Sequence, residues 1–73
     1  MTDAEFLRAE HAASGEEVSF TAWLEELAEW VGVTNSAAWK WVNGTRKMTQ
    51  TVRKLIFLRT RISPELRRAV AEI

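Results

Sequence analysis

Four side chains in the second half of the chain have the types and spacing to contact the edges of nucleic-acid bases. They are Asn35, Ser36, Trp39 and Lys40. In a helix that turns Ala38, Trp41 and Val42 toward the interior, these four and Asn43 lie on the opposite face. An Asn amide can pair bidentately with adenine, and a Ser hydroxyl can donate or accept a hydrogen bond.

Two of these residues have more than one interpretation. Asn35 and Ser36 could simply help to start the helix, because both residue types favour that position. Trp39 is expected to be exposed, where it would press on a thymine methyl group, line a groove wall or anchor a protein partner. The sequence leaves these alternatives open.

A second group of polar side chains surrounds this helix and suits the phosphate backbone. Short hydroxyls, an amide and long cations can bind phosphate oxygens, which position a protein without specifying sequence. A solvated basic loop is the alternative. The predicted phosphate-binding residues are Thr34, Asn43, Thr45, Arg46 and Lys47.

Little in the sequence indicates an enzyme. There is one histidine, His11, no cysteine, and no glycine-rich phosphate loop. The pairs Glu16-Glu17 and Glu25-Glu26 are adjacent in sequence, so they are expected to be solvated charges on diverging helix faces. We therefore predict a non-enzymatic protein with no metal, cofactor or small-molecule ligand.

The net charge of zero conceals an opposition between the two halves of the chain. Up to Val33, eight acidic residues face Arg8 alone, a net charge of −7; from Thr34 on, nine basic residues face two acidic ones, a net charge of +7. A basic half of the chain suits binding to a phosphate backbone. An acidic surface on the opposite side would orient the protein as it approaches and limit non-specific binding. Alternatively, the charges are merely solvated or pair with each other in the folded monomer.

Five helices are expected in a single domain of residues 1–73. Thr2 and Glu5 form a capping box that starts the first helix, and Ser14-Gly15 ends it. The second helix starts between residues 16 and 22, or at a capping box over residues 14–17, and ends at Val31. The third covers about 35–42, the fourth follows Thr49, and Ser63-Pro64 starts the last, over about 64–72. Arg53, Lys54, Arg59 and Arg61 are expected on the wet side of the fourth helix. Trp23 and Trp30 are expected to flank the inward stripe of the second helix, as partial core or as a subunit contact.

The stretch from Leu27 to Gly44 resembles the Cro and lambda-repressor-like (XRE-type) helix-turn-helix family. The matching residues are Leu27-Ala28, Gly32-Val33-Thr34, Trp41 and Asn43-Gly44. The resemblance implies a compact all-α domain with a central helix-turn-helix, in which the positions of Asn35, Ser36 and Trp39 contact bases. Trp39 departs from the family, where a small or polar residue is common. The implied function is that of a small phage-type repressor or autoregulator that binds double-stranded DNA.

A homodimer on a palindromic operator is expected, because so small a domain contacts few base pairs alone. Apolar residues in the last third exceed what one inward stripe needs, although they could instead complete the monomer's core. The predicted dimer contacts are Phe57, Leu58, Leu66, Val70 and Ile73. No apolar run reaches the length of a membrane span and no signal peptide is evident, so a cytoplasmic location is expected.

A second function from another class remains open. The same fold could serve as a helical protein-interaction module, for instance a phage-encoded inhibitor that presents a Trp-rich or acidic surface to a host protein. The acidic second helix favours this alternative, whereas the set Asn35, Ser36, Lys40, Arg46 and Lys47 favours DNA.

Overall fold

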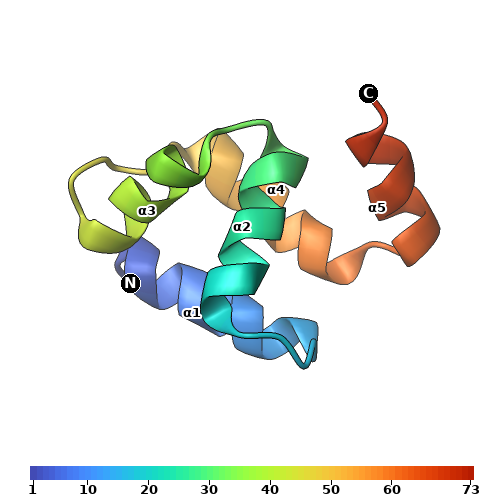
Figure 1. The fold of residues 1–73 in the computed structure, drawn as a ribbon, viewed down its shortest axis with the longest axis horizontal. Coiled ribbons are helices and arrows are strands. Elements are labelled where there is room, and N and C mark those ends of the chain that lie inside the picture. The colour runs from blue at the N-terminus through green and yellow to red at the C-terminus, as the bar shows by residue number, and fades with distance from the viewer.

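A computed structural model describes all 73 residues and contains five α-helices and no strands (Figure 1). In chain order they are α1 (Asp3–Ser14), α2 (Phe20–Val31), α3 (Asn35–Asn43), α4 (Gln50–Arg61) and α5 (Pro64–Ala71). The all-α, five-helix prediction is therefore confirmed. No helix is both long enough and apolar enough to cross a membrane.

Local capping signals decide where the helices begin. Thr2 and Glu5 form the predicted capping box of α1, and the side chains of Thr34, Thr49 and Ser63 cap α3, α4 and α5. Each hydroxyl accepts a hydrogen bond from a backbone N–H that the first turn would otherwise leave free. Pro64 occupies the first turn of α5, where its missing N–H costs nothing.

The start of α2, which the sequence left open, lies at Ser19-Phe20. Gly15 ends α1 in the left-handed conformation, and Ser19 accepts the N–H of Ala22 at 3.1 Å. The longer helix from residue 14 is therefore wrong. His11 holds the intervening segment: its Nε2 lies 2.8 Å from the carbonyl oxygen of Val18, to which it donates.

Two glycines end helices: Gly32 ends α2 before the turn to α3, and Gly44 ends α3 before the loop to α4. Gly32 has a φ of +93° and Gly44 a φ of +77°, which residues with a side chain rarely adopt. Gly32 lets the chain reverse between α2 and α3 in three residues. The N–H groups of Gly32 and Val33 both donate to the carbonyl oxygen of Ala28, at 2.9 and 3.0 Å.

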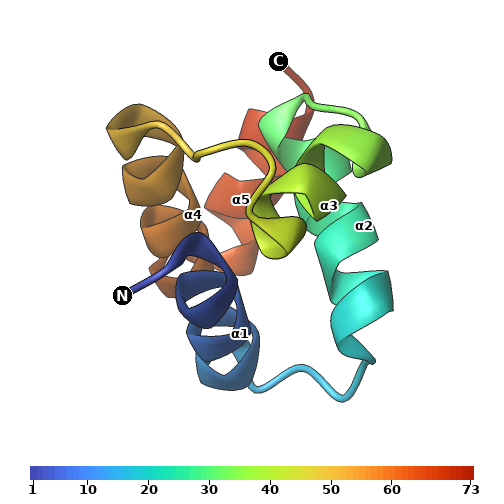
Figure 2. The same ribbon diagram turned by 90° about the vertical axis from the view of Figure 1, so that its left-hand side faces the viewer.

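The core lies where α2 meets α1, α3 and α4. Trp23 is fully buried, so it belongs to the inward stripe itself and not to its flank, whereas Trp30 is half-buried, as expected for partial core. Figure 2 shows α1 beside α4, with α5 behind them. The buried apolar residues are Phe6, Leu7, Trp23, Leu24, Leu27, Ala28, Ala38, Trp41, Met48 and Ile56.

The last helix is attached to the body mainly through α2. Trp30 donates its indole N–H to the carbonyl oxygen of Arg67 at 2.8 Å, and no residue of α5 is fully buried. Along the long axis of the molecule, α3 and α5 lie at opposite ends (Figure 1). The polar face of α3 and the apolar stripe of α5 are thus separate surfaces.

Candidate nucleic-acid interface

The outer face of α3 is polar and open to solvent. Ala38 and Trp41 bury the inner face, as predicted. On the opposite side, the side chains of Asn35, Ser36, Lys40 and Asn43 are all exposed. Three of the four predicted base-contacting residues therefore share one accessible surface.

The cap of α3 is made by Thr34 and not by the residues after it. Its Oγ1 accepts the N–H of Ala37 at 3.0 Å. The side chains of Asn35 and Ser36 make no hydrogen bond within the chain, and both are exposed. The interpretation that these two side chains serve only to start the helix therefore has no support in the geometry. The hydroxyl proton of Thr34 remains free to donate to a ligand.

Trp39 is not on the exposed face, and the prediction of an exposed indole is wrong. The ring is half-buried and packs against the core. Its centroid lies 6.2 Å from that of Phe20 in an edge-to-face arrangement. The reason is that Phe20, in the first turn of α2, reaches the flank of α3 and covers the indole. Only part of Trp39 remains accessible to a groove or a partner.

The loop after α3 carries two cations without acidic partners. The N–H groups of Thr45 and Arg46 donate to the carbonyl oxygen of Lys40 at 3.0 and 3.2 Å. Arg46 and Lys47 are exposed, and neither they nor Lys40 lie within ion-pair distance of a carboxylate. Thr45 differs, because its hydroxyl already donates to the same Lys40 oxygen at 3.4 Å. Its predicted phosphate contact would have to replace that long bond.

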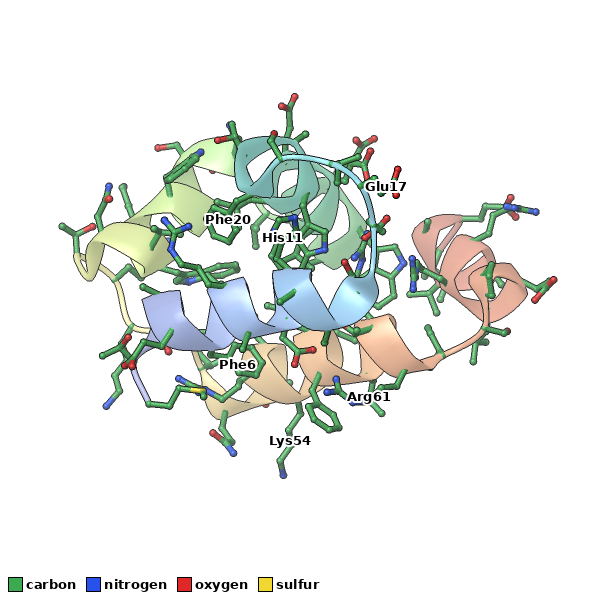
Figure 3. All side chains as sticks on the ribbon, turned by 90° about the horizontal axis from the view of Figure 1, so that it is seen from below. Phe6, His11, Glu17, Phe20, Lys54 and Arg61 are labelled. Atoms are coloured by element: carbon green, nitrogen blue, oxygen red, sulfur yellow. The ribbon has the colours of Figure 1, made fainter.

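Opposite charges from the two halves of the chain pair at two places only. Asp3 pairs with Arg53, and Glu10 pairs with Arg61 at 2.9 Å. Figure 3 shows Phe6, Lys54 and Arg61 gathered on the α1 and α4 side, away from Phe20. Intramolecular pairing therefore accounts for a small part of the basic half and leaves the cations around α3 free.

One predicted surface cation is buried. Arg59 is 5% exposed, and its Nε has no hydrogen-bond partner. Burial, reinforced by the nearby Arg67, lowers the pKa of the Arg59 guanidinium, against the opposing influence of Glu16 and Glu26. Its guanidinium carbon lies 5.7 Å from the centre of the Trp30 ring. The assignment of Arg59 to the wet side of α4 is wrong, because the side chain is buried beside Trp30 and close to Arg67 of α5.

Glu16 belongs to the same region and is not a freely solvated charge. It is half-buried, and its Oε2 is shielded from solvent without a hydrogen-bond partner. Glu17, Glu25 and Glu26 are exposed, as expected, although Glu16 and Glu17 lie in the segment between α1 and α2 and not on a helix; Glu25 and Glu26 do lie on a helix. Together with the exposed Glu29, the last two form an acidic outer face on α2.

Apolar side chains remain exposed on α4 and in the C-terminal segment. Phe57 is 45% exposed, Leu58 54%, Leu66 51% and Ile73 103%, while Val70 is half-buried. These side chains do not complete the monomer's core, which was the alternative to a dimer contact. Leu66 and Val70 lie four residues apart on one side of α5, and Ile73 follows just after the helix ends.

Sequence reasoning missed the functional geometry of Asp3. Its carboxylate accepts the N–H of Met48 and pairs with Arg53, residues 45 and 50 positions away. An acid in the first turn of α1 carries an ordinary local signal for helix formation. No local pattern identifies partners so distant in sequence.

Comparisons with protein-family models, curated proteins and solved structures find no match to this chain. The resemblance to the Cro and lambda-repressor-like family therefore stays a prediction from the residues between Leu27 and Gly44.

Proposed function

We propose that this chain is a non-enzymatic, sequence-specific double-stranded DNA-binding protein that acts as a homodimeric repressor or autoregulator on a palindromic operator. One observation carries the proposal: α3 exposes unused hydrogen-bonding side chains directly beside unpaired cations. Asn35, Ser36 and Lys40 supply the former group, and Arg46 and Lys47 extend its positive charge.

The dimensions of α3 suit the major groove of B-DNA. A helix with side chains is ~10–12 Å wide, and the groove is ~12 Å wide. With its outer face in the groove, Asn35 would pair with adenine and Lys40 with the O6 and N7 acceptors of guanine. Ser36 can donate or accept and so serves either base. Trp39 contributes at most the accessible edge of its ring.

The phosphate backbone would be held on both sides of α3. Thr34 offers its free hydroxyl proton at the start of the helix, and Asn43, Arg46 and Lys47 offer donors at its end. Such contacts supply affinity and register without sequence information. Thr45 is the weakest member of this set because its hydroxyl is already engaged.

The acidic outer face of α2 bears on how the protein approaches DNA. Glu25, Glu26 and Glu29 point away from the core, on the side of α2 opposite its buried stripe. With α3 in the groove, these charges repel orientations of the protein that would bring the α2 face onto the duplex. The same field reduces binding at random sites.

A dimer would form through the exposed apolar side chains of α5 and of α4. Half-sites one helical turn apart require each α3 to lie ~17 Å from the twofold axis. The longest dimension of the molecule is 33 Å, and α3 and α5 lie at its two ends. A twofold axis near α5 gives this spacing if the long axis of each protomer is inclined toward the twofold axis, so that both α3 helices face one side of a duplex.

The second candidate function is a helical interaction module, such as a phage-encoded inhibitor of a host protein. The observation in its favour is the exposed row of carboxylates on α2. A Trp-rich contact surface is disfavoured, because Trp23 and Trp41 are buried and the remaining two indoles are half-buried. Such a partner would therefore be basic.

Fluorescence anisotropy with labelled duplexes distinguishes the two candidates. The DNA proposal predicts binding to random duplex that weakens steeply as salt rises, because bound counterions are released. The variant Lys40→Ala should weaken this binding, whereas Glu29→Gln, on the acidic face, should not. Absence of binding at low salt would reject the proposal.

A further inference from the structure

The loop between α3 and α4 is fastened to the first turn of α1 by one carboxylate. Asp3 Oδ2 accepts the N–H of Met48 at 2.7 Å, and Oδ1 pairs with the guanidinium of Arg53. The Asp3 side chain is only 11% exposed, and Met48 is buried. Asp3 thus joins α1, the loop and α4 at one point.

The loop is anchored at both of its ends. At its start, the N–H groups of Thr45 and Arg46 bond to the carbonyl oxygen of Lys40, and at its end the N–H of Met48 bonds to Asp3. The two exposed cations Arg46 and Lys47 lie between these anchors. Below them a shallow hollow separates the loop from the start of α1, lined by Thr2, Asp3, Asn43, Gly44, Arg46 and Lys47 among others. Hydrogen bonds at both ends, together with the buried Met48 side chain, therefore define the path of the loop.

We propose that Asp3 is a positioning residue, which holds Arg46 and Lys47 in the arrangement that binds DNA phosphates. The proposal rests on the proposed DNA-binding function. A loop already fixed in its bound shape loses less conformational freedom on binding, so more of the interaction energy appears as affinity. Asp3 acts through the backbone of Met48 and does not itself touch DNA.

This role makes a prediction opposite in sign to simple electrostatics. Asp3 is an acid beside a loop that is to approach phosphates, and its removal raises the net charge by one and frees Arg53 from its partner. Coulomb's law alone then predicts tighter binding and a steeper salt dependence. A positioning role of Asp3 predicts weaker binding and a shallower salt dependence.

The test compares Asp3→Ala with Asp3→Asn, which change the charge equally. Asn keeps one oxygen that can accept the Met48 N–H, whereas Ala keeps none. Glu29→Gln is the matched control, because it removes an exposed acid that has no ion-pair partner. Affinity for a random 20-base-pair duplex is measured by fluorescence anisotropy at several salt concentrations. Circular dichroism checks that each variant is folded.

For Asp3→Ala we expect affinity several-fold below that of the wild type and a salt slope lower by up to about two units, one for each displaced cation. The affinity of Asp3→Asn should lie between those of Asp3→Ala and the wild type. Glu29→Gln should bind as tightly as the wild type or more tightly. An Asp3→Ala variant that binds as tightly as the wild type, with an unchanged slope, overturns the proposal. If Asp3→Ala does not fold, Asp3→Asn is compared with Glu29→Gln: weaker binding supports the proposal and equal or tighter binding overturns it.

Hydrogen exchange of the Met48 amide in the free protein separates this claim from the DNA-binding claim. The amide should exchange slowly in the wild type and at least about tenfold faster in Asp3→Ala, as expected when a local hydrogen bond is lost. A wild type that shows this protection but binds no duplex refutes the proposed function, and with it any role of Asp3 toward DNA. A wild type that binds DNA but exchanges this amide as fast as Asp3→Ala refutes the positioning role alone.

Discussion

Replacing Asn35 by Ala should weaken binding to the cognate site without weakening the fold. The structure allows the two effects to be separated, because Thr34 supplies the cap of α3 and the Asn35 side chain is exposed without a hydrogen bond inside the chain. Ala is a better helix former than Asn by at most ~0.7 kcal/mol, so the free energy of unfolding should stay constant or rise slightly. Loss of a bidentate contact to adenine should cost ~1–3 kcal/mol of binding, or about five- to 150-fold in affinity.

The assay is a fluorescence anisotropy titration on two duplexes. One carries the cognate site, obtained by selection from a pool of duplexes with a randomised centre, and the other is a permuted sequence of the same composition. Asn35→Ala should lose affinity for the first and keep its affinity for the second. Thermal unfolding supplies the control: Thr34→Ala should lower the stability by ~0.5–2 kcal/mol, whereas Asn35→Ala should not. An equal loss on both duplexes, or a fall in stability like that of Thr34→Ala, would show that Asn35 is a scaffold residue and refute the assignment.

Three further outcomes are expected. Arg46→Ala and Lys47→Ala should each weaken binding to all duplexes alike and reduce the salt slope by about one unit; unchanged slopes would remove the loop from the interface. Leu66→Glu should turn a wild-type dimer into a monomer in sedimentation equilibrium at micromolar concentration, and a wild-type monomer that binds one half-site as tightly as a palindrome would refute the dimer. Arg59→Met should raise the free energy of unfolding by about 1 kcal/mol, since the buried guanidinium lacks an ion-pair partner; urea titration showing a loss of that size would contradict this.

Helix boundaries were largely predictable because capping is local. Thr34, Thr49 and Ser63 each lie directly before a helix, and each side chain accepts a hydrogen bond from the backbone N–H three residues later. The start of α2 was ambiguous because two serines compete for the cap. Ser14 is instead used to end α1, where its hydroxyl donates to the carbonyl oxygen of His11 at 2.6 Å, and this leaves Ser19 as the cap.

The environments of Arg59 and Trp39 could not be obtained from helical periodicity. Arg59 lies three residues after the buried Ile56, so its position is on the inner stripe of α4, but the preference of arginine for solvent favoured the opposite assignment. Trp39 lies on a flank of α3, where burial depends on what the neighbouring helix supplies. In both cases a side chain from α2, Trp30 or Phe20, covers the residue.

The candidate site was predictable as a helix face but not as a supported structure. The spacing from Asn35 to Lys40 places the polar residues correctly on α3, apart from Trp39. The support of the adjacent loop by Asp3 depends on contacts across 45 residues or more, which no local pattern encodes. Such contacts arise only when the three helices α1, α3 and α4 are packed together.

Selection from a pool of duplexes with a randomised centre tests the central claim most directly. The wild-type protein is incubated with the pool at moderate salt, bound duplexes are recovered and amplified, and the enriched sequences are read. We predict a palindrome whose half-sites are centred about 10 base pairs apart. One position in each half-site should be enriched in adenine with the wild-type protein but not with Asn35→Ala. Recovery of no preferred sequence after repeated rounds would contradict the account.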